Sequence, residues 1–179
     1  MIQTIRIGTL LREAVTTPYR NLVTRPTGAA VRNRIEEALA RSDCHTAYLD
    51  FSDVELLDLS CADEVVAKLL MAEAGPVRFV VLAGLREDQH EAIEHVLTHH
   101  RIAVAAVPHG ASGPRLLGWA TSDARAVFSC IVDRGPMCAD QVAAALGWAE
   151  SRAVPALDAL AIRRLVRRED DLYHPLPIA

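Results

Sequence analysis

The sequence predicts an α/β domain with a mixed sheet, followed by a mainly α-helical domain that ends in a β-hairpin. Over residues 1–107, short apolar runs alternate with amphipathic helical patterns, which is typical of sheets built from crossover units. After the turn-rich stretch at 108–114, three helical patterns follow one another and two short β-type runs close the chain. We therefore expect two domains, residues 1–107 and 115–179, joined by a linker at 108–114.

The first region contains alternating strand and helix patterns. Residues 2–11 alternate loosely in hydrophobicity and are predicted as an edge strand. The predicted buried strands are residues 46–51, 77–83 and 102–107. The predicted helices are residues 29–39, 61–73 (closed by Gly75-Pro76) and 86–100. This order predicts a sheet covered by helices.

The second region contains three helix patterns. They cover residues 120–133, 139–146 and about 149–163, and Gly147 separates the last two. Two strands are predicted at 165–168 and 172–176, around the polar turn Glu169-Asp170-Asp171. Three helices and a closing hairpin are the order of a winged helix-turn-helix domain.

Residues 127–176 resemble the winged helix domains of bacterial regulators of the MarR and TrmB type. Three segments carry the resemblance. DRGPMCADQVAAALG is similar to the loop and helix that precede the recognition helix. SRAVPALDALAIRRLVRR is similar to the recognition helix running into the wing, and LYHPL is similar to the returning strand of the wing. It implies a DNA-binding regulator, acting as a homodimer because one module reads a half-site. The implied DNA contacts, beside Glu150, are Ser151, Arg152, Arg163, Arg164, Arg167 and Arg168.

Three features of this region favour a different use. Residues 115–179 contain eight basic and eight acidic residues, so a DNA-binding face requires charge sorting. Pro155 falls inside the recognition helix, and the wing tip at 169–171 is acidic. Under the alternative hypothesis, the arginines pair with acids such as Asp158, and the module serves dimerisation or protein contact.

The run AYLDFSDVELLDLSCADEVVAKLL, residues 47–70, resembles the central strand, loop and helix of STAS domains, the fold of anti-sigma factor antagonists. Together with LVTRPTGAAVRNRIEEAL, residues 22–39, the resemblance extends over residues 2–107. It implies a protein partner such as a kinase or an anti-sigma factor. By position, Ser60 falls on the family's phosphorylated serine and Asp58 on the aspartate before it.

Two interpretations of Ser60 remain open. A helix N-terminus stabilises a phosphate through unpaired N–H groups, which fits a phosphorylation switch. The family's Ser-Ser-Gly is replaced here by Leu59-Ser60-Cys61, however, and Asp63 and Glu64 follow at once and would repel a phosphate. The simpler interpretation makes Ser60 the N-cap of the helix, with Asp63 or Glu64 completing the capping interaction.

Other chemistry has weaker support. His95 and His99 lie four residues apart on a predicted helix, but no third ligand converges on them, so a solvated helix face is favoured over a metal site. The loop Arg25–Gly28 lacks the glycine pattern of phosphate-binding motifs and is the one basis for an enzyme acting on a small phosphorylated substrate. Cys130 and Cys138 lie in apolar surroundings typical of core packing rather than redox sensing. We expect no cofactor and no catalytic site.

Composition sets the final expectations. The net charge is −4, which excludes a polybasic protein that binds nucleic acid along its whole length. The sequence begins without a signal-peptide pattern, and its apolar runs are too short to cross a bilayer. We therefore expect a cytoplasmic bacterial transcription regulator whose STAS-like domain receives a signal. The alternative is a partner-switching adaptor that binds a kinase or anti-sigma factor and no DNA.

Overall fold

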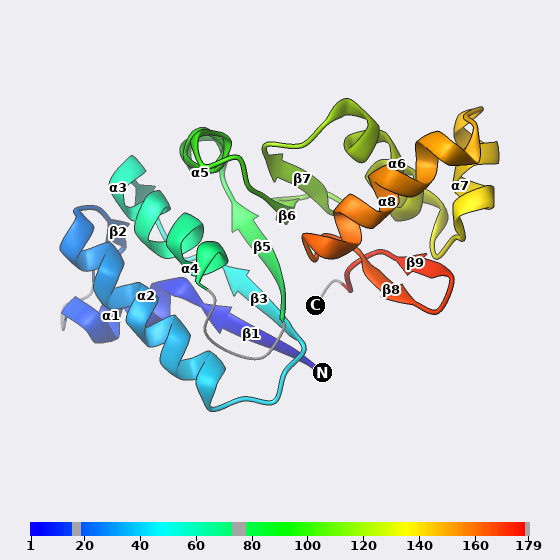
Figure 1. Ribbon diagram of the computed structural model, residues 1–179. Helices are drawn as coiled ribbons and strands as arrows, with labels where there is room; N and C mark the ends of the chain where they lie inside the picture. The colour runs from blue at the N-terminus through cyan, green and yellow to red at the C-terminus, as the bar shows by residue number, and fades with distance from the viewer. Residues whose placement is uncertain (16–18, 73–77, 178–179) are drawn as a thin grey trace.

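A computed structural model describes residues 1–15, 19–72 and 78–177. Its main sheet has five strands in the order β1-β3-β5-β6-β7 (Figure 1). These strands are β1 (Ile2–Arg6), β3 (Thr46–Asp50), β5 (Phe79–Leu85), β6 (Ala103–Pro108) and β7 (Arg115–Gly118). The first four run parallel, and β7 pairs antiparallel with β6. The prediction of an α/β fold with a mixed sheet is therefore confirmed.

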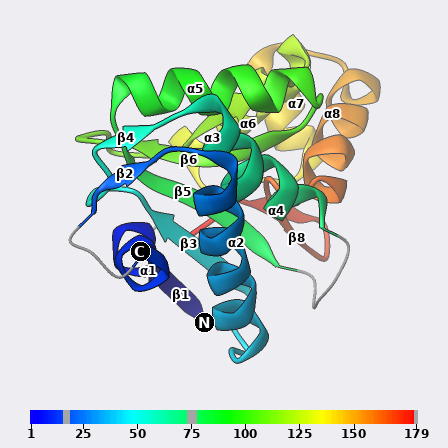
Figure 2. The ribbon, with the colours of Figure 1, turned by 90° about the vertical axis from the view of Figure 1, so that its left-hand side faces the viewer.

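Helices cover both faces of this sheet (Figures 1 and 2). On one side lie α1 (Ile7–Val15), α2 (Arg25–Ala40) and α5 (Glu87–His99). A continuous helical segment on the same side consists of α3 (Leu59–Ala62), η1 (Asp63–Ala67) and α4 (Lys68–Met71). On the other side lie α6 (Ser122–Arg134), α7 (Ala139–Leu146), α8 (Glu150–Ile162) and the hairpin of β8 (Arg167–Glu169) and β9 (Leu172–His174). None of these helices is both long and apolar enough to cross a membrane.

Alternate residues of each strand belong to two different hydrophobic cores. The side chains that pack with α1–α5 include Leu49, Leu82, Val104 and Leu117. The side chains that pack with α6–α8 and the hairpin include Tyr48, Val81, Ala105 and Leu116. Successive strand side chains point to opposite faces of a sheet, so the apolar strands supply both cores at once.

The region predicted as a linker, residues 108–114, connects two neighbouring strands of the main sheet. β6 ends at Pro108, and β7 begins at Arg115 and returns beside it. Residues 115–118, predicted to belong to the second domain, thus form the last strand of the sheet. The three helices that follow pack on the second face of that sheet rather than at a distance from it.

The N-terminal prediction of one strand over residues 2–11 is wrong in its second half. The strand ends at Arg6, and α1 begins at Ile7. Ile7 and Leu11 are both fully buried, and their spacing of four residues places them on one face of the helix. Gly8 allows close packing, because a Cβ there would lie 2.6 Å from the Cβ of Asp53.

The other predicted elements agree with the structure to within a few residues. β3, α7 and α8 lie where apolar periodicity and the Gly147 stop predict them. The short parallel pair β2 (Asn21–Leu22) and β4 (Leu56–Leu57) was not predicted. The predicted helix end at Glu73, its Gly75-Pro76 stop and the strand start at Val77 lie outside the described residues.

Candidate functional site

Asp58, at the amino end of α3, is the centre of a hydrogen-bonded cluster. Its carboxylate accepts hydrogen bonds from the backbone N–H of Cys61 at 2.7 Å, from the Ser60 hydroxyl at 2.8 Å and from the Thr24 N–H at 3.0 Å. Burial by itself would raise the pKa of Asp58, but these hydrogen bonds outweigh burial and lower it. Asp58 is therefore ionised at neutral pH and joins the start of α2 to the start of α3.

The interpretation of Ser60 as the N-cap is wrong, because Asp58 holds that position. Asp58 has extended backbone angles and its side chain accepts from Cys61, three residues later, as an N-cap does. Ser60 lies in the first turn of α3 and is half-buried. Neither Asp63 nor Glu64 completes a capping interaction with Ser60, since both carboxylates bond to cationic side chains instead.

Glu64 is a buried carboxylate surrounded by three cations. It is 3% exposed and accepts hydrogen bonds from Arg25 at 2.7 Å, from Arg32 and from Lys68. Burial would raise the pKa of Glu64, but the hydrogen bonds from Lys68 and Arg25 outweigh that effect and lower it. The result is an ionised carboxylate that ties α2 to η1.

Asp63 extends this network to α5. Its carboxylate oxygens lie 2.8 Å from Arg25 Nη1 and 2.8 Å from His100 Nε2. Burial opposes ionisation of Asp63, yet the contacts with Arg25 and His100 lower its pKa. Arg25 thus bridges two adjacent acids, and its pKa is raised by both of them.

The loop Arg25–Gly28, considered from its sequence as a phosphate site, makes its contacts within the protein. The guanidinium of Arg25 binds Asp63 and Glu64, and Gly28 lies against η1, where a Cβ would come within 3.0 Å of the Glu64 Cβ. In this arrangement the loop supports helix packing, because glycine lets α2 and η1 approach closely.

Cys61 packs beneath the cluster as a neutral thiol. Burial, with the nearby negative charge of Asp58, raises its pKa to about 12. Its Sγ lies 3.0 Å from the Thr24 carbonyl oxygen, to which it donates. A thiol with this pKa is not a nucleophile at neutral pH.

Two exposed leucines flank the cluster on the surface. Leu56 is 51% exposed and Leu59 is 50% exposed, and they lie on either side of Asp58 in the sequence. Large apolar side chains exposed beside fixed polar groups are a common feature of protein-binding surfaces. We call Leu56, Asp58, Leu59 and Ser60 the α3 surface.

The arginines predicted to contact DNA mostly bind acceptors within the protein. Arg152 makes two hydrogen bonds to Asp123, at 2.8 and 3.0 Å, and stacks over Trp148. In the hairpin, Arg167 pairs with Glu169 at 3.3 Å. Arg168 pairs with Asp158 at 3.3 Å and also donates to the Asp170 carbonyl.

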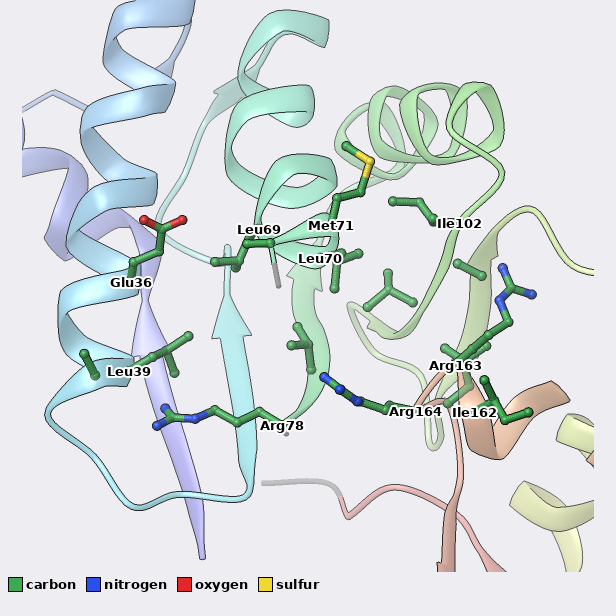
Figure 3. A pocket seen from close by; sticks show the side chains of 16 residues that line it. Glu36, Leu39, Leu69, Leu70, Met71, Arg78, Ile102, Ile162, Arg163 and Arg164 are labelled. Atoms are coloured by element: carbon green, nitrogen blue, oxygen red, sulfur yellow. The ribbon is translucent and has the colours of Figure 1, made fainter. Parts of the chain in front are cut away.

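Arg163 and Arg164 directly follow Ile162, the last residue of α8. Arg163 donates to the Trp119 carbonyl at 2.8 Å, and both side chains line a pocket beside the sheet (Figure 3). The exposed residues of α8 are Glu150, Ser151, Arg152, Pro155, Ala159 and Ile162. The one cation among them is Arg152, which pairs with Asp123, whereas phosphate contacts require unbalanced basic groups.

The histidine and cysteine candidates lie apart. His95 and His99 are exposed on α5, whereas His100 turns to Asp63. Within residues 1–15, 19–72 and 78–177, no three His, Cys, Asp or Glu side chains gather as a metal site would need. Cys130 is buried in α6, and Cys138 donates to Asp140 at 2.7 Å.

Sequence reasoning missed the Glu64 network. In the helical pattern of residues 29–39, Arg32 lies on the side opposite the apolar stripe, but in the structure its side chain reaches across to Glu64 on η1. The available signal was Glu64 itself, an acid directly before the apolar run Val65-Val66-Ala67 and four residues before Lys68.

No protein-family model, curated protein or solved structure matches the chain. Function is therefore inferred from the arrangement of these residues.

Proposed function

We propose that this chain is a cytoplasmic bacterial adaptor of a partner-switching pathway. In this proposal a STAS-like unit docks on a kinase or anti-sigma factor, and the winged-helix-like unit makes protein contacts rather than DNA contacts. One observation carries the proposal: of the five arginines predicted for DNA, three pair with carboxylates of the protein, and the other two, Arg163 and Arg164, line a pocket beside the sheet. The three arginines that pair with carboxylates leave no unbalanced positive charge on α8 or the hairpin for a phosphate backbone.

The α3 surface supports the docking part of the proposal. Leu56 and Leu59 offer exposed apolar area, and the Asp58 hydrogen bonds hold the first turn of α3 in one geometry. A rigid apolar patch binds a partner with a small loss of conformational entropy. Ser60 lies within this patch, so a phosphate on its hydroxyl would place negative charge beside Asp58 and change the affinity of the surface.

The docking test uses the kinase or anti-sigma factor encoded beside this chain, titrated calorimetrically. Leu59→Glu should abolish binding, because it places a charge in the apolar patch. Leu172→Glu is the matched control, since Leu172 is a similarly exposed leucine on β9. Equal binding by the native chain and both variants would contradict the proposal, and so would loss of binding in both variants.

A phosphorylation test addresses Ser60 separately. Protein expressed together with that kinase should gain one phosphate by intact mass, and Ser60→Ala should not. A phosphate mapped to another residue would remove Ser60 from the proposed switch while leaving docking intact.

DNA binding by a homodimer is the second candidate, favoured by the order of α6, α7, α8 and the β8–β9 hairpin. An electrophoretic shift with the chain's own upstream DNA at low salt separates the two candidates, because phosphate contacts are strongest there. The adaptor proposal expects no shift. A salt-dependent shift that Arg164→Gln and Arg167→Gln weaken would establish DNA binding instead.

A further inference from the structure

A pocket of about 810 Å³ lies at the amino ends of β5 and β6. Its walls come from α2, α4, the two strands and the end of α8, so residues from both predicted domains form it (Figure 3). Its volume falls within the roughly 300–1,000 Å³ typical of small-molecule sites. None of the residues that line it belongs to the α3 surface.

The interior of the pocket is apolar. Its lining includes Leu39, Leu70, Val80, Ile102, Val104 and Ile162. Ile162 is 80% exposed although it is one of the largest apolar side chains of α8. These side chains suit a hydrocarbon chain, which would be removed from water on binding.

Arginines give the pocket a positive rim. Arg78, Arg163 and Arg164 line it, and the one acid among its described lining residues, Glu36, is 3.6 Å from Arg32. Figure 3 shows Arg164 reaching from the end of α8 toward β5. Its guanidinium makes no hydrogen bond or ion pair with the described part of the chain.

Two further arginine features indicate missing negative charge. The buried Nε of Arg78 has no acceptor among the described residues, although its Nη2 donates to the Ser42 carbonyl at 2.6 Å and buried donors are nearly always paired. Burial and the neighbouring Arg125 lower the pKa of Arg163, so these two guanidiniums repel each other. An anion in the pocket would relieve that repulsion and supply acceptors.

We infer that this pocket binds a single-chain anionic amphiphile, with the carboxylate at Arg164 and the hydrocarbon chain along the apolar interior. The charge of the rim selects the anionic head, and the apolar lining selects the chain. This site goes beyond the proposed adaptor function and does not depend on it.

Isothermal titration with sodium decanoate below its micellar concentration tests the inference on the full chain. Decanoate should bind more tightly than decanol, which has the same chain length and no charge. Arg164→Gln should weaken decanoate binding about tenfold, the factor expected for one charge-assisted hydrogen bond. Arg101→Gln is the matched control, because Arg101 ends α5 in the same left-handed conformation but does not line the pocket.

A blocking variant locates the site independently. Ala40 is an exposed residue at the end of α2 that lines the pocket, so Ala40→Trp should prevent decanoate binding while the circular dichroism spectrum stays unchanged. Absence of decanoate binding to the native chain would overturn the inference. Equal affinity for decanol, or equal weakening by Arg101→Gln, would also overturn it. Binding to anionic phospholipid vesicles without binding of free decanoate would assign the arginines to a membrane surface instead.

Discussion

Glu64 is the residue on which the packing of α2 against η1 depends most. Its buried carboxylate bonds to three cationic side chains, two of them from α2. Removing one partner of such a cluster leaves uncompensated charge in a poorly solvated place. The sequence distance between Glu64 and Arg32 makes this a tertiary contact rather than a property of either helix.

Glu64→Gln should lower the free energy of unfolding by about 3 kcal/mol, because the three cations then repel each other without a counter-charge. Urea unfolding followed by circular dichroism measures the change. The control is Glu36→Gln, which removes an exposed acid 3.6 Å from Arg32 and should change stability by less than about 1 kcal/mol. Equal effects of the two variants would contradict a special role for Glu64.

The lowered pKa values of Asp63 and Glu64 predict how the stability of the protein depends on pH. Their ordinary pKa values are 3.8 for Asp63 and 4.5 for Glu64, and folding lowers both. A lowered pKa in the folded state stabilises the protein above the unfolded-state pKa, and this contribution is lost as pH falls through the folded-state value. Stability should therefore be constant near neutrality and decline below about pH 4.5, less steeply in Glu64→Gln. A decline that begins well above pH 4.5 would contradict the assignment to these two acids.

At the scale of elements, α5 and α8 end in the same unusual way. Arg101 and Arg164 adopt left-handed backbone angles, with φ of 55° and 58°. The residue after each one donates back into the last turn: Ile102 to the Leu97 carbonyl, and Leu165 to the Leu160 carbonyl. This is the Schellman arrangement, in which glycine is the usual left-handed residue. Gly147 occupies that position at the end of α7.

Arg101→Gly should raise the free energy of unfolding by up to about 1 kcal/mol. A left-handed conformation costs a non-glycine residue roughly 1–2 kcal/mol, and the greater freedom of unfolded glycine offsets about 0.5–1 kcal/mol of the gain. Arg101→Ala retains the strain and should show no gain. Destabilisation by the glycine variant, measured by urea unfolding, would indicate that the Arg101 side chain itself holds the helix end.

At the scale of the whole molecule, one sheet joins two hydrophobic cores. Leu49 and Tyr48 are adjacent in β3, yet Leu49 packs with α1–α5 and Tyr48 with α6–α8. Loss of the sheet therefore removes the surface on which both sets of helices pack. The two predicted domains should unfold together.

Leu49→Ala tests this coupling. The side chain is fully buried in the first core, so the substitution should cost about 2–5 kcal/mol. Trp119 and Trp148 lie in the C-terminal region and report on it by fluorescence, whereas far-ultraviolet circular dichroism reports on the whole chain. Both probes should shift by the same amount in urea. An unchanged fluorescence midpoint would show that the region containing Trp119 and Trp148 unfolds independently of the first core.

The sequence by itself determined most of the secondary structure. Apolar runs predicted β3, β5 and β6, and helical periodicity with the Gly147 stop predicted α7 and α8 nearly to the residue. These features depend on neighbours within a few positions, and local sequence records such neighbours directly. Ser60 was also placed at the start of a helix, although the N-cap of that helix is Asp58 rather than Ser60.

Only the tertiary structure decided what the charged side chains contact and which faces are covered. Arg32 and Glu64, Arg152 and Asp123, and Arg163 and the Trp119 carbonyl are each separated by about thirty residues or more. The pocket likewise needs α2, α4 and α8 at one end of the sheet. Periodicity shows that a side chain lies on a polar or apolar face, but its partner depends on how distant elements pack. Here the packing of three helices on the second face of the sheet determined the surroundings of Arg163 and Arg164.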